Sequence, residues 1–206
     1  DYSSLTLKFN LNSTIKATGN NPDLDYLETE LLLVPEENVF QRILSKDITA
    51  APKATIAEGK TIHFTWKKYT PIYQFQVDAE VQTQNMLYKI KPQSFPITDV
   101  PSELEQYIQP TEFIDINQDI INKASTIVAG ETDLYEAVFK LADWTKTNIQ
   151  YDLNTITAKA VKKSSWVFEN KEGVCDELTN LFISFLRSVG IPARFVTGMV
   201  YTNVDY

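Results

Sequence analysis

The chain has 206 residues, of which 43% are apolar and 22% are charged, with 6 glycines and 9 prolines. This composition is typical of a globular protein with one large or two small cores, and it excludes a disordered or low-complexity chain. Acidic residues outnumber basic ones 27 to 19, and the sequence pI is about 4.7. A chain this acidic offers no basic surface for phosphates, so no nucleic-acid partner is expected.

The sequence lacks four features: a membrane span, a zinc cluster, an internal disulfide and a phosphate loop. The apolar run at residues 31–34 stops at Pro35, far short of the ~20 residues that cross a bilayer, so no membrane span is expected. One cysteine, Cys175, and one histidine, His63, are too few for a zinc cluster or an internal disulfide, and the glycines are too scattered for a phosphate loop. We therefore expect neither a metal nor a cofactor.

Because the chain begins at Asp1 rather than Met, a preceding leader or membrane anchor is compatible with it, and the compartment, including export, stays open.

Residues 1–95 show a hydrophobic period of two. Apolar residues alternate with polar ones at 5–11, 62–66 and 73–77, with 80–84 continuing the last run. Turn-forming residues lie between these runs at 19–22, 35–38 and 58–60. The pattern predicts half-buried antiparallel strands arranged as a β-sandwich domain.

The period changes after a proline-rich stretch. Residues 96–111 contain Pro96, Pro101 and Pro110 with little periodicity, which predicts an extended linker between two domains. Beyond it, residues 117–128 predict a short helix, and a second helix to about residue 149 is expected to begin after a cap at 132–133. The fold class is therefore α+β, with domains at 1–95 and 112–206.

The most informative segment surrounds Cys175. Apolar residues recur at helical spacing from 178 to 189, followed by Gly190-Ile191-Pro192, and residues 194–201 predict a strand. Gly173 allows a tight turn, which places Cys175 at the helix N-terminus, where the helix dipole and unpaired N–H groups favour a thiolate and can hold an oxyanion. The adjacent acids Asp176 and Glu177 oppose that effect. The alternative is that Cys175 is a small buried apolar residue.

This segment resembles a known family. Residues 173–198 (GVCDELTNLFISFLRSVGIPARFVTG) are similar to the nucleophile segment of the transglutaminase-like superfamily, which includes transglutaminases, peptide N-glycanases and prokaryotic proteins regarded as cysteine proteases. Residues 141–152 (LADWTKTNIQYD) resemble the helix upstream of it in that family. The resemblance covers about residues 115–206, and the first half looks like the sandwich that accompanies this core in some archaeal members. It implies the first part of a papain-like core.

The resemblance also implies a Cys-His-Asp site in which Cys175 attacks a carboxamide and forms a thioester. The family's His and Asp lie beyond Gly198, and the 206 residues do not contain them. Since His63 falls in the sandwich half, we expect a strand residue there and a chain that is an inactive fragment without its general base. The implied substrate is a peptide or protein amide, with protease, amidase and cross-linking activity left open. The alternative is a non-catalytic binding or scaffold module.

Other residues near this segment have weaker roles. Trp166 lies nine residues before the cysteine and is expected either to contact substrate or an oxyanion, or to pack in the core. Arg194 is expected to form a salt bridge within the fold, and Asp152 and Asp176 do not form a defensible acid/base pair. The strand at 194–201 would lack a neighbour within these residues, so we expect another copy, a downstream fragment or a continuation of the polypeptide to complete that edge.

Overall fold

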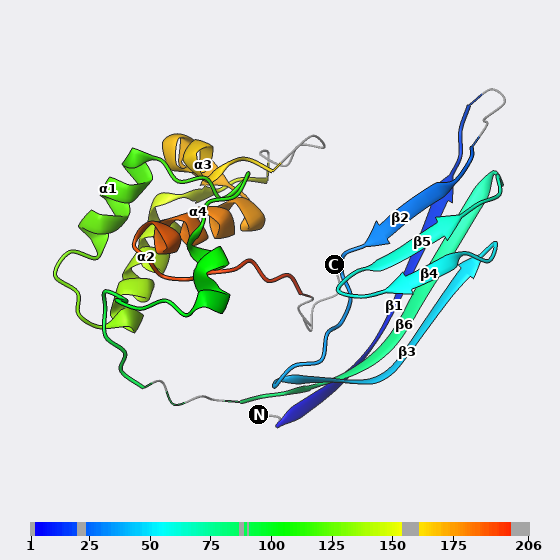
Figure 1. Ribbon diagram of the computed structural model, residues 1–206, viewed down its shortest axis with the longest axis horizontal. Coiled ribbons are helices and arrows are strands. Elements are labelled where there is room, and N and C mark those ends of the chain that lie inside the picture. The colour runs from blue at the N-terminus through cyan, green and yellow to red at the C-terminus, as the bar shows by residue number, and fades with distance from the viewer. Residues whose placement is uncertain (1–2, 20–23, 87–88, 90, 154–160, 199–206) are drawn as a thin grey trace. The chain divides into compact units, whose positions relative to one another are not determined.

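The computed structural model describes residues 3–19, 24–86, 89, 91–153 and 161–198. These residues form two compact units, one built on the chain up to Lys89 and one built on Ile90 to Thr197 (Figure 1). Each unit is described below by itself. Within the described part of the chain, no helix is both long and apolar enough to cross a membrane.

The first unit consists of two three-stranded antiparallel sheets. In one sheet, β6 (Ile72–Gln84) lies between β1 (Ser4–Lys16) and β3 (Gln41–Ala51), with a bulge in β3 between Ile43 and Ser45. In the other, β5 (Ile62–Trp66) lies between β2 (Leu27–Leu31) and β4 (Thr55–Glu58). The predicted antiparallel β-rich half is confirmed, although the sequence pattern revealed only β1, β5 and β6.

The two central strands supply the core of this unit. Alternate side chains of β5 and β6 are buried and pack together, because a period of two places every second residue on the same face. Phe64 stacks on Phe75 with ring centroids 4.4 Å apart, and Trp66 lies 5.3 Å from Tyr73. The Trp66 Nε1 donates to the Pro52 carbonyl at 2.7 Å, so the polar atom of this buried ring is satisfied.

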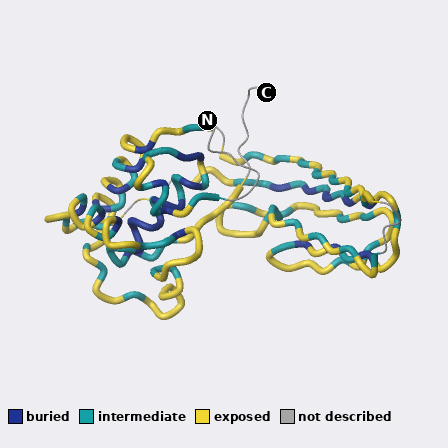
Figure 2. The backbone as a smooth tube through the Cα atoms, turned by 90° about the horizontal axis from the view of Figure 1, so that it is seen from above, coloured by how far each residue is buried: buried dark blue, intermediate teal, exposed yellow. Residues whose placement is uncertain are grey.

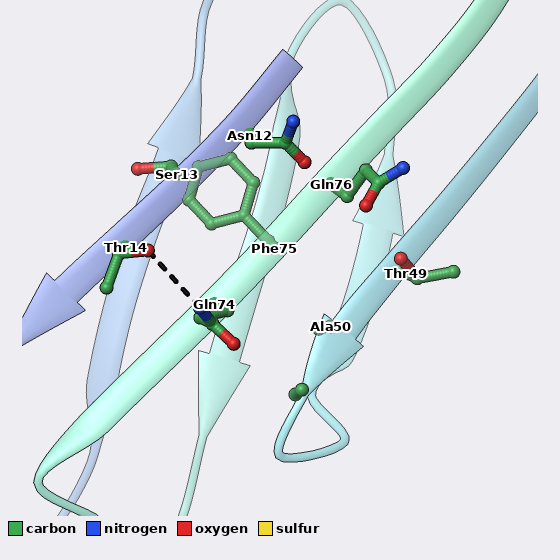
Figure 3. Close-up of a pocket in the computed structure, with 9 residues that line it drawn as sticks. Asn12, Ser13, Thr14, Thr49, Ala50, Gln74, Phe75 and Gln76 are labelled. Carbon is green, nitrogen blue, oxygen red and sulfur yellow. Dashed lines mark hydrogen bonds between the residues drawn. The ribbon is translucent and has the colours of Figure 1, made fainter. Parts of the chain in front are cut away.

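A shallow hollow of about 310 Å³ lies on the sheet formed by β1, β6 and β3 (Figure 3). Short polar side chains from the three strands line it, including Asn12, Thr14, Thr49, Gln74 and Gln76. Gln74 donates to Thr14 Oγ1 across the strands at 3.4 Å. None of the described residues that line it carries a titratable group.

The second unit is mainly helical. Its elements are η1 (Ser102–Ile108), α1 (Gln118–Ile127), α2 (Leu134–Asn148), β7 (Gln150–Tyr151), α3 (Ser164–Asn170), β8 (Glu172–Gly173) and α4 (Cys175–Ser188). The Asn117 side chain accepts from the Ile120 N–H, and Asp133 accepts from the N–H groups of Tyr135 and Glu136, so both caps fix where a helix begins. These contacts confirm the helices predicted at 117–128 and from 132–133 onward.

Helix α4 packs against α1, α2 and α3. Its apolar face is buried. In Figure 2 the buried residues, drawn in dark blue, lie among exposed stretches of the chain, drawn in yellow. Phe185 is fully buried and meets Trp144 and Phe168 edge-on, with ring centroids 5.2 and 5.9 Å away. The buried core comprises Ile120, Ala124, Val128, Ala137, Leu141, Ile149, Val167, Leu181, Phe185, Leu186 and Ile191.

The expected linker at 96–111 is folded onto the helical unit. It contains η1, and the Tyr107 carbonyl accepts from the Ala193 N–H at 3.0 Å. Arg187, only 7% exposed, donates to the carbonyls of Gln109 and Ala193. Residues 102–108 therefore differ from the extended backbone predicted for the segment, since they form the short helix η1, while the domain boundary itself stays a prediction.

The predicted strand at 194–201 is not observed where the chain is described. Residues 194–198 pair with no strand, and 199–201 lie outside the described residues. The apolar spacing suited a strand, but a strand also needs a hydrogen-bonded neighbour, and no described segment provides one. The role expected for this segment as a sheet edge awaiting a partner is therefore not supported by the described part, which runs from Arg194 to Gly198.

Candidate active site

Cys175 is the first residue of α4, and its side chain is exposed. The chain reaches it through β8, which pairs in parallel with β7. The Asp152 N–H donates to the Gly173 carbonyl at 3.0 Å and extends this pairing by one bond. Two short strands therefore hold the backbone directly before the thiol, and the predicted position of Cys175 at a helix N-terminus agrees with the structure.

Gly173 packs closely against the first turn of α4. A Cβ at this position would lie 3.1 Å from Glu177 Cβ and 3.2 Å from both Glu177 Oε2 and Leu178 Cδ1. At contacts this short, these side chains would have to give by a few tenths of an ångström. Glycine therefore favours the close packing of β8 against the helix that carries the thiol.

The Glu177 side chain holds the start of this helix in place through hydrogen bonds. The residue is 2% exposed, and its two oxygens accept from the Val174 N–H at 3.0 Å and the Lys162 N–H at 2.9 Å. One carboxylate therefore joins the turn before Cys175 to the segment that leads into α3. A buried carboxylate is retained only when hydrogen bonds replace its hydration, as they do here.

The sequence analysis interpreted Glu177 only as an acid that opposes a thiolate. Its capping role was missed because the usual signature pairs Glu at this position with Ser or Thr as the N-cap residue, whereas Val174 occupies that position. The one sequence signal for this capping role was the Glu that follows the N-cap residue Val174 by three positions. Asp176, the other predicted acid, accepts from the Glu177 N–H at 3.0 Å.

The first turn of α4 can also stabilise a negative charge. Its first N–H groups have no helical carbonyl before them, and the helix dipole places partial positive charge there. Among the described residues, no acceptor is found for the N–H groups of Cys175 and Asp176. An exposed thiol beside free N–H donors is suited to attack on a carbonyl whose oxygen becomes an anion.

Trp166 lies on α3, half-buried against the helical core. The Lys162 ammonium lies 5.2 Å from the centroid of its ring. Both the core packing and a partly accessible ring are therefore present. A contact between Trp166 and a substrate or an oxyanion stays a prediction.

His63 lies in the other unit, on β5. Its side chain is 56% exposed, and its Nε2 lies 3.3 Å from Glu30 Oε1 and 3.1 Å from Thr61 Oγ1. The expectation of an exposed strand residue is confirmed. Within the helical unit, Cys175 has no imidazole beside it, since the sequence contains no other histidine.

Comparisons with known proteins agree with this geometry. Residues 121–205 match the transglutaminase-like superfamily. A solved structure from Cytophaga hutchinsonii, named as a "Putative Cysteine Protease", is 17% identical and superposes with a TM-score of 0.68, covering 92% of this chain and 67% of that one. At this identity the likeness shows a shared fold.

Two curated relatives are longer proteins. The uncharacterized protein ML0607 of Mycobacterium leprae is 26% identical over 113 residues, which is 55% of this chain and 38% of that protein. The uncharacterized protein YebA of Bacillus subtilis is 26% identical over 110 residues, or 50% of this chain and 15% of that one. The chain therefore spans well under half the length of either curated relative.

Proposed function

We propose that this chain, which carries a transglutaminase-like superfamily domain, belongs to a thiol enzyme that acts on amide bonds with Cys175 as nucleophile. The observation that carries the proposal is the exposed thiol on the first residue of α4, held in place by Gly173 and Glu177. This combination of a fixed backbone, an accessible sulfur and free N–H donors suits acyl transfer or hydrolysis through a thioester.

The steps follow from the chemistry of the thiol. The Cys175 thiolate attacks the amide carbonyl carbon, a C–S bond forms, and the negative charge that develops on oxygen faces the N–H groups of the first turn of α4. The C–N bond then breaks, and the amine leaves after it receives a proton. Water or a second amine attacks the resulting thioester and frees the thiol. Trp166 is proposed to contact the substrate near this point.

The proton transfers need a general base, usually an imidazole in sites of this kind. His63 is the one histidine in these 206 residues and pairs with Glu30 in the β unit. We therefore expect these residues alone to be inactive toward amides. We propose that a histidine and an aspartate from outside these 206 residues complete the site.

A second candidate is a non-catalytic module in which the fold is retained for binding. The observation that favours it is the absence of an imidazole beside Cys175 in the described helical unit. In that case the exposed thiol would react no faster than a free cysteine with any acyl donor.

In the test, imidazole added to the solution replaces the missing general base. The 206-residue protein is mixed with a p-nitrophenyl ester of a blocked glutamine peptide, with and without added imidazole, and the adduct is located by mass spectrometry. We expect a thioester on Cys175 that forms faster than on N-acetylcysteine amide, with imidazole speeding the step. The Cys175→Ala variant should give no adduct, and His63→Ala should behave like wild type. An equal rate on the free cysteine derivative would support the non-catalytic module, and amide turnover that His63→Ala abolishes would refute the proposed source of the base.

A further inference from the structure

Two lysines and two aromatic rings meet on the helical unit at a place that the proposed reaction does not use. Lys123 on α1 and Lys171 after α3 place their ammonium groups 5.6 and 4.9 Å from the centroid of the Trp144 ring on α2. The Lys171 ammonium also lies 3.7 Å from the centroid of Phe168. We call these four residues the lysine–aromatic cluster.

The two positive charges in this cluster lack a carboxylate partner. Both lysines are half-buried, and in the described part of the chain neither ammonium has a carboxylate oxygen within 4.0 Å. Burial, together with the charge of Lys123, holds the pKa of Lys171 below its usual value. In a chain with a net charge of −8, two neighbouring cations without an acid between them are unexpected.

The backbone and the ring that support the cluster are held in place. Lys171 adopts the left-handed conformation, with φ of 60°, and its backbone is fixed by hydrogen bonds from its N–H to the Val167 carbonyl and from the Gln150 N–H to its own carbonyl. Trp144 packs edge-on against the fully buried Phe185. The Lys171 backbone and the Trp144 ring therefore keep their positions without a ligand.

We propose that the lysine–aromatic cluster binds an oxyanion, either a carboxylate or a phosphate group. Such a group in contact with both ammoniums would offset their repulsion and accept a charge-assisted hydrogen bond from each. Because both lysines are half-buried, their side chains lose less freedom on binding than fully exposed lysines would. The site requires neither Cys175 nor a general base, so it is a property separate from the proposed reaction.

The experiment follows the NMR signal of the Trp144 indole N–H group. The protein is labelled with ¹⁵N-tryptophan, which gives signals from Trp66, Trp144 and Trp166, and the Trp144 signal is assigned with Trp144→Phe. Inorganic phosphate and, separately, N-acetylglutamate amide are titrated at constant ionic strength set with sodium chloride. We expect the Trp144 signal alone to move and to saturate with at least one of the two anions. Tighter binding of phosphate or of the blocked glutamate identifies the source of the oxyanion.

Matched variants separate a built site from general charge attraction. Lys171→Met and Lys123→Met keep an apolar stem against the rings, and each should weaken binding about tenfold or more, whereas Lys171→Arg should retain it. Lys146→Met, which removes an exposed lysine from the last turn of α2, serves as the control and should bind like wild type. Equal affinity in both cluster variants, or no response of Trp144 to either anion, would overturn the proposal. The two lysines are tested independently, so one variant that fails to fold leaves the other decisive.

Discussion

Replacement of Glu177 by Met should loosen the start of α4. Methionine is similar in length but removes both carboxylate oxygens, so the buried Val174 N–H and the part-buried Lys162 N–H lose their acceptors. An unsatisfied buried donor costs about 1–3 kcal/mol and a part-buried one costs less, so the two together should cost about 1–4 kcal/mol. Glu177→Gln keeps one acceptor at most and should lie between wild type and Glu177→Met.

Hydrogen exchange followed by mass spectrometry measures this change locally. The free energy of opening should fall by the stated amount in peptides that cover 161–178, which contain both amides. The control is Glu169→Met, which changes an exposed acid on α3 and should alter the opening free energy by less than about 0.5 kcal/mol. A loss below about 1 kcal/mol in Glu177→Met would refute the argument that this carboxylate holds the segment before Cys175.

Three further changes test other parts of the helical unit. Gly173→Ala should cost about 1–3 kcal/mol in urea unfolding, because its Cβ would lie 3.1–3.2 Å from atoms of the first turn of α4; an unchanged midpoint would contradict this. Phe185→Ala should cost about 3–5 kcal/mol, since the ring is fully buried between Trp144 and Phe168, and a loss under about 2 kcal/mol would show that the core collapses around the gap. Lys171 has a lowered pKa in the folded state, caused first by burial and then by Lys123. At pH values between that pKa and the ordinary value of 10.5, the unfolded chain binds more protons at Lys171 than the folded protein does. The free energy of unfolding of the wild type should therefore rise with pH in this range, compared with that of Lys171→Met. Parallel curves of unfolding free energy against pH for the two proteins would exclude the effect.

The sequence predicted those elements whose signal lies within one segment. Helix α2 follows from the Asp133 cap and its apolar stripe, and β6 follows from strict alternation. Helix α3 was missed because seven residues are too few to show a helical period, and its start is fixed from a distance: the Asp115 side chain accepts from the Ser165 N–H at 2.9 Å. The strand expected at 194–201 is not seen in its described part, 194–198, for the related reason that pairing depends on a second segment.

The same distinction holds at the candidate site. The helix that follows Gly173 and the exposed position of Cys175 could be predicted from neighbouring residues alone. The bond between Glu177 and the Lys162 N–H could not, because it joins positions 15 residues apart without a shared pattern. The lysine–aromatic cluster was missed for the same reason, since its members come from α1, α2, α3 and the residue directly after α3.

The contacts of residues 107–115 have a consequence for synthesis on the ribosome. Phe113 and Asp115 supply carbonyls to the hydroxyls of Ser164 and Ser184, and the Gln109 carbonyl binds Arg187. These partners lie 51, 69 and 78 positions further along the chain. At about 5–20 residues per second, the early segment waits roughly 3–16 s before its partners have been made. During that interval the earlier β unit has its own strands complete, so we expect it to fold first, while the helical unit must wait until α4 has left the ribosome.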